Sequence, residues 1–343
     1  MHASPLAQTA RSLVAPGKGI LAADESFPTI GKRFGALKID STETNRRAYR
    51  EMLFSTPALG DFISGVILFD ETLRQRSAAG RPLVELLFSQ GILPGIKVDL
   101  GTTELTNFPG ETITQGLDGL RERLREYYGL GARFTKWRAV LKIKDDLPSA
   151  TCIEANAHTL ARFAALSQEA GLVPIVEPEV LMDGDHSLDR TAEVTTATLD
   201  AVFKALDRHR VRLDEMLLKP AMVVPGADCV QTVSDGEIAG RTLACLHRSV
   251  PATVPGIVFL SGGQTPAQAT QRLAAINRAG HAPWALTFSC GRALQDPALT
   301  AWHGDPANVS AAQSALLERA RRNCEAIRPL AEASKAVAAT HSV

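Results

Sequence analysis

The sequence predicts a single (β/α)8 barrel, the TIM-barrel fold, with helical extensions at both ends. Short β-rich runs alternate with longer helical patterns along the whole chain of 343 residues. Most of these runs are almost continuously apolar, as parallel strands buried on both faces must be. Polar residues follow several runs, and the carboxyl ends of barrel strands meet at one mouth. We expect one domain over residues 1–343, with the barrel at about 17–300 and a C-terminal helix and tail at about 309–343.

Eight strands are predicted from runs rich in β-branched and other apolar residues. In chain order they cover residues 19–24, 63–69, 94–99, 132–138, 172–179, 215–222, 256–261 and 284–289. Repeated strand–helix units are compatible with an open doubly wound sheet, but eight of them favour closure into a barrel.

Three of the intervening helices have recognisable ends. Thr265 and Pro266 begin a helix that ends before Gly280, because a capping hydroxyl and a proline suit the first turn and glycine suits the end. Leucines at helical spacing predict a helix over residues 117–129. A third helix is expected over residues 149–171, capped by a serine at its start.

The composition excludes several kinds of protein. The formal net charge is zero and the isoelectric point is about 7.1, so bulk charge favours neither a nucleic-acid partner nor a membrane surface. Residues 1–19 lack the apolar core of a signal peptide, and no stretch matches a membrane helix. The five cysteines form no Cys-x-x-Cys pair and the eight histidines form no ligand pair. We expect a cytoplasmic enzyme with free thiols and no metal site.

Lys219 is the most informative single residue. It lies in the apolar run at 215–222 and precedes Pro220, which blocks further sheet pairing. Burial disfavours a charged ammonium, so a lysine at this strand end can be an uncharged amine, which attack on a ketone requires. The same window also fits a lysine that reaches from a strand end to solvent.

Further polar residues converge on the same end of the predicted barrel and favour the reactive amine. Each one alone could be an ordinary ion pair, but together they predict an active site at the mouth. In an extended strand, residues two apart share a face, so the carboxylates on either side of Pro178 can both point inward. The converging set is Asp24, Lys97, Lys136, Arg138, Glu177, Glu179, Lys219, Ser261 and Arg292.

Two glycine-rich turns predict an anion site. Residues 261–263 follow the seventh predicted strand, and residues 290–292 follow the eighth. Backbone N–H groups in such turns, together with an arginine, can cradle a phosphate, and this part of a barrel is a frequent phosphate site. The alternative interpretation is that these glycines only form turns and bind no ligand.

These segments resemble those of the class I fructose-1,6-bisphosphate aldolases, the Schiff-base type that needs no metal. The resemblance covers roughly residues 5–330. The segments that carry it are 21–26 (Leu-Ala-Ala-Asp-Glu-Ser), 31–33 (Gly-Lys-Arg), 95–99 (Gly-Ile-Lys-Val-Asp), 135–138 (Thr-Lys-Trp-Arg), 174–179 (Pro-Ile-Val-Glu-Pro-Glu), 217–220 (Leu-Leu-Lys-Pro), 259–264 (Phe-Leu-Ser-Gly-Gly-Gln) and 289–294 (Ser-Cys-Gly-Arg-Ala-Leu).

The resemblance implies the catalytic roles. Lys219 would form the Schiff base with the C2 ketone of the substrate, and Glu177 would act as acid and base during dehydration of the carbinolamine. Asp24, assisted by Lys136, would take the C4-hydroxyl proton as the C3–C4 bond breaks. Glu179 would orient the lysines. The protonated imine then accepts the electrons of the broken bond as a neutral enamine, so no cofactor is implied.

The resemblance also implies two phosphate sites, which would hold the reacting bond in place. Those for the C1 phosphate would be Ser261, Gly262, Gly291 and Arg292. Those for the C6 phosphate would be Ser26, Lys97 and Arg33, with Arg138 near them. Partners would be phosphosugar substrates in glycolysis and gluconeogenesis, and family members are commonly homotetramers.

The sequence departs from the animal members in two places. Residues 27–30 read Phe-Pro-Thr-Ile in what we expect to be a loop, where the animal type has small residues including a serine. This change leaves sedoheptulose 1,7-bisphosphate and fructose 1-phosphate open as alternative substrates. No tyrosine follows Tyr128, whereas animal members end in a tyrosine that assists proton exchange on the enamine. We expect Glu177, Glu179 or water to supply that proton and residues 336–343 to matter little.

Two other interpretations remain. The first is a non-catalytic barrel that binds phosphosugars. Absence of Lys219 or Glu177 would favour it, but both residues are present. A metal-dependent aldolase would need histidine ligands at a regular spacing, which the sequence does not show.

Overall fold

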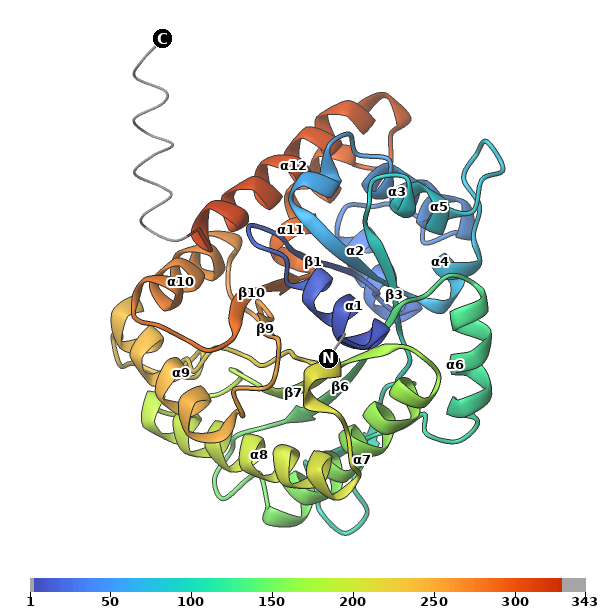
Figure 1. Ribbon diagram of the computed structural model, residues 1–343. Coiled ribbons are helices and arrows are strands. Elements are labelled where there is room, and N and C mark those ends of the chain that lie inside the picture. The colour runs from blue at the N-terminus through green and yellow to red at the C-terminus, as the bar shows by residue number, and fades with distance from the viewer. Residues whose placement is uncertain (1–2, 329–343) are drawn as a thin grey trace.

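The computed structural model describes residues 3–328 and contains a closed barrel of eight parallel strands, which confirms the predicted fold (Figure 1). Around the barrel the order is β1-β10-β9-β8-β7-β6-β3-β2, so the first and last strands pair and close the ring. The barrel strands are β1 (Gly19–Ala23), β2 (Ile63–Leu68), β3 (Leu93–Lys97), β6 (Phe134–Leu141), β7 (Val173–Val180), β8 (Leu217–Leu218), β9 (Gly256–Phe259) and β10 (Ala285–Cys290).

Three strand features differ from the prediction for physical reasons. β8 has only two residues, because Pro220 cannot donate a ladder hydrogen bond and Lys219 turns into the mouth. β6 and β7 extend three residues and one residue beyond the predicted runs, so Lys136 and Glu177 lie well within strands. β4 (Thr102–Glu104) and β5 (Thr112–Thr114) form a small antiparallel sheet that the sequence does not predict.

The helices surround the barrel as the alternating pattern predicts (Figure 1). The predicted caps are present: the Thr265 and Ser149 hydroxyls accept from the N–H groups of Gln268 and Cys152. The helices are α1 (Pro5–Leu13), α2 (Phe27–Ala36), α3 (Glu43–Phe54), α4 (Asp70–Arg74), α5 (Leu83–Phe88), α6 (Leu120–Gly129), α7 (Ala150–Glu169), α8 (Leu188–Arg208), α9 (Asp235–Ser249), α10 (Pro266–Arg278), α11 (Arg292–Trp302) and α12 (Val309–Ala326).

The two helical extensions cover different parts of the barrel. α1 lies over the opening at the amino ends of the strands, toward the viewer in Figure 1, and its buried Leu13 packs in one core cluster with Ile20 and Phe134. α12 packs along α11 and also contacts α10 and α3. With one opening closed by α1, the carboxyl end is the side of the barrel that can receive a ligand.

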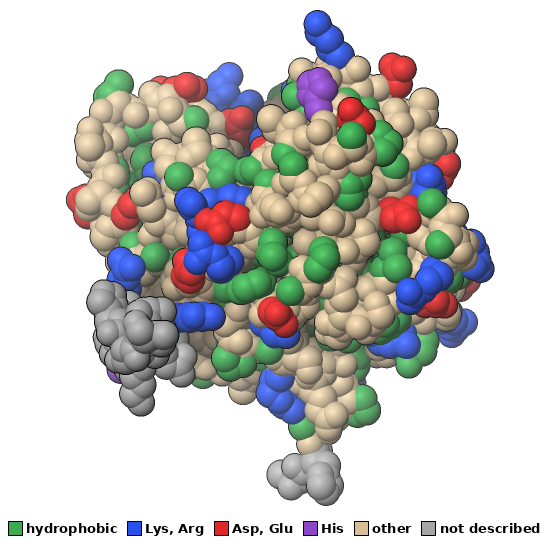
Figure 2. All heavy atoms as spheres, turned by 90° about the horizontal axis from the view of Figure 1, so that it is seen from above, with side chains coloured by type: hydrophobic (Ala, Val, Ile, Leu, Met, Phe, Trp, Pro, Cys, Tyr) green, Lys and Arg blue, Asp and Glu red, His purple; other side chains and the backbone are tan. Residues whose placement is uncertain are grey.

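The surface carries both signs of charge. Figure 2 shows one face on which basic and acidic side chains are interspersed. No helix within residues 3–328 combines the length and the apolar character needed to cross a membrane. The expectation about residues 336–343 concerns a part of the chain outside the described range.

Candidate active site

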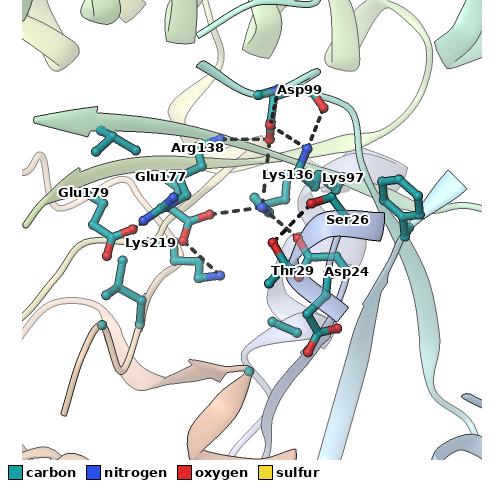
Figure 3. A pocket seen from close by; sticks show the side chains of 18 of the residues that line it. Asp24, Ser26, Thr29, Lys97, Asp99, Lys136, Arg138, Glu177, Glu179 and Lys219 are labelled. Carbon is teal, nitrogen blue, oxygen red and sulfur yellow. Dashed lines mark hydrogen bonds and ion pairs between the residues drawn. The ribbon is translucent and has the colours of Figure 1, made fainter. Parts of the chain in front are cut away.

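A cavity of about 650 Å³ opens at the carboxyl end of the barrel, and every site residue predicted from the sequence lines it. The predicted residues at its wall are Asp24, Ser26, Arg33, Lys97, Lys136, Arg138, Glu177, Glu179, Lys219, Ser261, Gly262, Gly291 and Arg292. Figure 3 shows the charged members facing one another across this space.

Lys219 and Glu177 form a buried pair at the centre of the site. The Lys219 Nζ atom lies 3.1 Å from Glu177 Oε1, and both side chains are about 95% buried. The backbone N–H of Lys219 donates to the carbonyl of Val176 on β7, which sets the lysine beside the strand that carries Glu177. Glu177 Oε2 is buried and makes no hydrogen bond within the described residues, so its hydrogen-bonding capacity is unused there.

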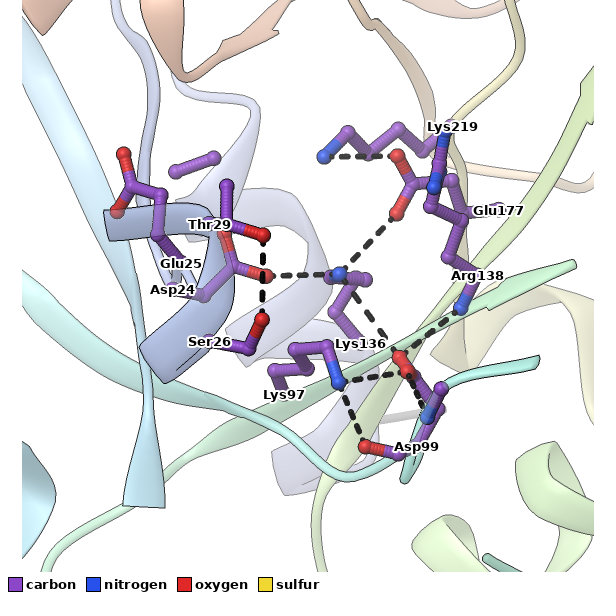
Figure 4. Close-up of polar contacts among 12 residues, drawn as sticks. Asp24, Glu25, Ser26, Thr29, Lys97, Asp99, Lys136, Arg138, Glu177 and Lys219 are labelled. Carbon is purple, nitrogen blue, oxygen red and sulfur yellow. Dashed lines mark hydrogen bonds and ion pairs between the residues drawn. The ribbon is translucent and has the colours of Figure 1, made fainter. Parts of the chain in front are cut away.

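Lys136 lies among three carboxylates. Its Nζ atom is 2.7 Å from Asp24 Oδ2, 3.5 Å from Glu177 Oε2 and 3.9 Å from Asp99 Oδ2 (Figure 4). Burial on its own would lower the pKa of Lys136, but the three carboxylates outweigh burial and raise that pKa above its usual range. Burial likewise would raise the pKa of Asp24, but the charges of Lys136, Lys219 and Lys97 lower it instead. Asp24 is therefore ionised at neutral pH.

Lys97 is held by Asp99. The Lys97 Nζ atom lies 2.6 Å from Asp99 Oδ1 and also donates to the Asp99 carbonyl at 2.7 Å. Asp99 in turn accepts from the backbone N–H groups of Gly101 (3.2 Å) and Arg138 (3.4 Å). One buried carboxylate thus links β3, β6 and the loop that leads to β4.

Glu179 pairs with Arg138 instead of a lysine. The Arg138 Nε atom donates to Glu179 Oε2, and the arginine side chain is partly exposed at the mouth. Gly262 lies against this pair, since an added Cβ would be 2.6 Å from Leu260 Cδ1 and 3.1 Å from Glu179 Oε1. A side chain at residue 262 would displace the carboxylate.

Arg33 points its guanidinium at two carboxylates. It donates to Glu25 and lies 2.9 Å from Asp296 Oδ1. Glu25 is also 2.5 Å from the buried Arg50. Burial on its own would lower the pKa of Arg33, but Glu25 and Asp296 act with the nearby Tyr49 to outweigh burial and raise that pKa. Arg33 reaches the cavity wall as one member of this buried network.

The two predicted anion turns lie at another part of the wall. Ser261 and Gly262 follow β9, and Gly291 and Arg292 begin α11 after β10. Arg292 is exposed and has no ion pair within residues 3–328. The Ser289 hydroxyl is buried beside them and has no hydrogen-bond partner among the described residues. Open N–H groups, a hydroxyl and an unpaired arginine can bind an anion.

Residues 27–30 are the first turn of α2, which corrects the expectation of a loop there. Ser26 occupies the N-cap position, but its hydroxyl contacts the Thr29 hydroxyl at 3.1 Å and caps no backbone N–H. Phe27 packs edge-on against Phe69 with 5.1 Å between ring centroids, and the Arg46 guanidinium lies 4.7 Å above its ring. These contacts anchor the helix start that carries Ser26, and Phe69 is itself part of the cavity wall.

Three residues of the site are missed by sequence reasoning. Asp99 follows Lys97 by two positions, so strand alternation could have placed it on the same face. Glu25 and Ser289 adjoin predicted residues in the sequence and give no signal of their own. Within residues 3–328, no group of three or more His, Cys, Asp and Glu side chains is arranged to hold a metal ion.

Comparison with known proteins gives consistent results. The family model described as fructose-bisphosphate aldolase class-I matches residues 5–342. A probable fructose-bisphosphate aldolase class 1 of Xanthomonas campestris is 55% identical over 324 residues, which is 94% of this chain and 97% of the other. Fructose-bisphosphate aldolase 4, cytosolic, of Arabidopsis thaliana is 55% identical over 91% of this chain and 79% of its own. The structure of Plasmodium falciparum fructose-bisphosphate aldolase, solved with TRAP and a small-molecule inhibitor, superimposes with a TM-score of 0.93 at 50% identity, over 94% of this chain and 93% of that one.

Proposed function

This chain belongs to the class I fructose-bisphosphate aldolase family, and on that premise we propose that Lys219 is its Schiff-base lysine. The enzyme is a lyase that acts on phosphosugars. One observation carries the assignment: a buried lysine and a buried glutamate lie 3.1 Å apart at the mouth of the barrel. The amine that attacks the C2 ketone must first lose a proton, and Glu177 is within reach to take it.

Glu177 can then act as the acid for dehydration. Attack by Lys219 gives a carbinolamine, whose hydroxyl leaves as water once it has received a proton. The Oε2 atom of Glu177, which makes no hydrogen bond within the described residues, can carry that proton. The product is a protonated imine at C2, which draws electrons from the neighbouring C3–C4 bond.

Asp24 is the base that we propose for bond cleavage. Its lowered pKa keeps it ionised, so it can take the C4-hydroxyl proton as the bond breaks. Lys136, 2.7 Å away, stabilises the carboxylate and the negative charge that develops on the C4 oxygen. The first product is glyceraldehyde 3-phosphate. The remaining enamine gains a proton at C3, and hydrolysis of its imine releases dihydroxyacetone phosphate.

We assign the phosphate groups to opposite sides of the cavity. The C1 phosphate would bind at Ser261, Gly262, Gly291 and Arg292, where N–H groups and an arginine have no partner within residues 3–328. The C6 phosphate would bind near Ser26, Lys97, Arg33 and Arg138. The second side contains the Phe27 turn, so the choice between fructose 1,6-bisphosphate, fructose 1-phosphate and sedoheptulose 1,7-bisphosphate would be made there.

Borohydride trapping tests the assignment. Reduction in the presence of dihydroxyacetone phosphate should inactivate the enzyme and add one triose phosphate to the peptide that contains Lys219, as mass spectrometry would detect. Labelling of another lysine, or of none, would disprove the role of Lys219. Lys219→Ala is the matched variant and should gain no adduct. Because imine chemistry needs no metal, activity should also survive EDTA.

Two further proposals rest on relatives and resemblance. We propose a cytoplasmic enzyme, because the Arabidopsis relative is described as cytosolic. We also propose a homo-oligomer, and by family resemblance a tetramer. Light scattering coupled to gel filtration would test this, and a mass near 36.7 kDa, that of one chain, would contradict it.

A further inference from the structure

Arg319 on α12 connects the two turns that we assign to the C1 phosphate. Its Nη2 atom donates to the Pro266 carbonyl and to the Thr270 hydroxyl, each at 2.7 Å. Its Nε atom donates to the Ala293 carbonyl at 3.2 Å. Pro266 and Thr270 belong to the first turns of α10, and Ala293 to the first turn of α11. One guanidinium therefore binds the starts of both helices.

These two helix starts determine the shape of the anion site. The turn with Ser261 and Gly262 leads into α10, and Gly291 and Arg292 open α11. β9 and β10 are neighbouring strands, but their pairing ends at Phe259 and Phe288, before either turn begins. Beyond the paired residues, the spacing between the turns depends on contacts such as those of Arg319. The planar guanidinium presents its donors in a fixed arrangement.

The surroundings of Arg319 separate it from the other arginines of its helix. Arg321 and Arg322 form ion pairs with Glu318 on the exposed face of α12. Arg319 makes no ion pair within residues 3–328 and binds two carbonyls and a hydroxyl instead. Thr270, its hydroxyl partner, also lies 2.5 Å from Oδ1 of the buried Asn323. The contact is thus built into the packing of α12 on α10 and α11.

The charge of Arg319 also reaches the end of β10. Burial raises the pKa of the Cys290 thiol to about 11, and Lys219 and Arg319 both act against that rise. Arg319 Nε donates to the carbonyl of Ala293, two residues after Gly291, so the positive charge of Arg319 lies next to the anion turn. An anion in the turn would be favoured by it.

We propose that Arg319 is a positioning residue for the C1 phosphate, which it supports by holding the turn after β9 and the turn after β10 at a fixed spacing. It contacts neither the reacting atoms nor the phosphate. The proposal rests on the assignment of that phosphate under the proposed function. It gives the C-terminal helix a role in substrate binding.

The test uses borohydride trapping of the full chain at increasing concentrations of dihydroxyacetone phosphate, whose only phosphate belongs to this site. Arg319→Ala should raise the half-saturating concentration about tenfold, equivalent to about 1.4 kcal/mol. Trapping by unphosphorylated dihydroxyacetone should be unchanged, because that compound does not use the turns. Millimolar guanidinium should restore part of the loss in Arg319→Ala. Arg321→Ala, two residues along the same helix, is the matched control and should behave as wild type.

The outcomes separate the two proposals. If the wild-type enzyme itself gains no adduct on Lys219, the proposed function fails. If the wild type is trapped and Arg319→Ala has the same half-saturating concentration, the positioning role is wrong. An equal loss of trapping with and without the phosphate would show a general structural defect and would also overturn the proposal. Should Arg319→Ala fail to fold, Thr270→Val removes one of the three contacts and should give a smaller shift in the same direction.

Discussion

The two sides of the cavity that we assign to phosphates are built differently. On the side of α2 and β3, each cation already has a carboxylate: Lys97 has Asp99, Arg33 has Glu25 and Asp296, and Arg138 has Glu179. On the side of β9 and β10, Arg292 has none within residues 3–328, and the turns offer N–H groups and a hydroxyl. A phosphate on the first side, which we call the paired side, must compete with carboxylates of the protein. On the second side, which we call the open side, a phosphate can bind groups that have no carboxylate partner within residues 3–328.

This difference suggests that the two sides contribute differently to substrate binding. Binding at the open side should supply most of the affinity that fragments with one phosphate show. Binding at the paired side rearranges existing ion pairs, and rearrangement favours ligands whose second phosphate is at the right distance. The open side would therefore give affinity and the paired side selectivity among sugars. Asp24, Lys136, Glu177 and Lys219 lie between the two and should serve all substrates alike.

The largest effect on activity is expected for Asp24, which lies between the two phosphate sides. Asp24→Asn keeps the shape but removes the proposed base, so kcat should fall by about 10²–10⁴-fold for fructose 1,6-bisphosphate and fructose 1-phosphate alike. Steady-state kinetics with both substrates checks this. A loss confined to the bisphosphate would assign Asp24 to the paired side, and the centre of the site would then no longer serve all substrates alike.

Arg292→Ala should produce the next largest effect. It removes a charge-assisted contact worth about 1.5–3 kcal/mol, or roughly tenfold to 150-fold in kcat/KM. Both substrates carry the C1 phosphate, so both should suffer to the same degree. The prediction is tested by measuring kcat/KM for the two substrates. A selective loss with the bisphosphate would mean that our assignments of the C1 and C6 phosphate sites are interchanged.

Lys97→Ala should act on the bisphosphate much more than on fructose 1-phosphate, by about tenfold in KM if one charge-assisted contact is lost. The variant also leaves Asp99 without its partner, 3.9 Å from Lys136. Lys97→Ala combined with Asp99→Asn restores the charge balance and serves as the control. If the double variant regained full activity on the bisphosphate, Lys97 would only neutralise Asp99 and would not bind phosphate.

Phe27→Ala should loosen the turn that carries Ser26. The aromatic contact with Phe69 and the cation–π contact with Arg46 together stabilise this turn by about 1–2 kcal/mol. Loss of part of this energy should raise KM for the bisphosphate roughly threefold. Phe88 is a matched control, because it is also about half-exposed and has the Arg133 guanidinium 5.7 Å from the centre of its ring. It is far from Phe27 in the sequence. An equal effect from Phe88→Ala would point to general stability rather than to the turn.

The smallest effect concerns acid stability. Folding lowers the pKa of Asp24 from its ordinary value of about 3.8, so its contribution to stability is present above that value and is lost as pH falls through the folded pKa. The free energy of unfolding, measured by urea at pH values from 6 down to 3, should therefore fall less steeply for Asp24→Asn than for wild type. Identical slopes would indicate that Asp24 gains little from Lys136.

The sequence is sufficient for the architecture and for the central charged residues of the cavity wall. Alternation of apolar runs and helices identifies a barrel, and a barrel brings strand ends to one mouth, so the amino-acid pattern alone places Lys219, Glu177 and Asp24 together. The pairing of charges cannot be predicted in this way, because it depends on side-chain conformation as well as on strand register. Arg138 is level with Glu177 and Val140 with Glu179, yet the Arg138 guanidinium pairs with Glu179.

Short elements escape prediction for a related reason. β4 and β5 have three residues each, too few for a periodic signal, and they are paired across a loop. The start of α2 at Phe27 resembles a loop in sequence because Pro28 follows it, although proline suits the first turn of a helix. Asp99 lies in a recognisable segment, but its contacts with β6 and the loop toward β4 appear only in three dimensions, so its role does not follow from the pattern.

The pairing of β1 with β10 has a consequence for how the enzyme is made. Ile20 on β1 lies opposite Ser289 on β10, so the ring cannot close until nearly 290 residues have left the ribosome. A nascent chain that ends after β6 would carry Asp24 and Lys136 but neither Glu177 nor Lys219. Synthesis at about 5–20 residues per second leaves such chains incomplete for many seconds. Activity should therefore appear in one step, late in translation, when the first strand meets the last.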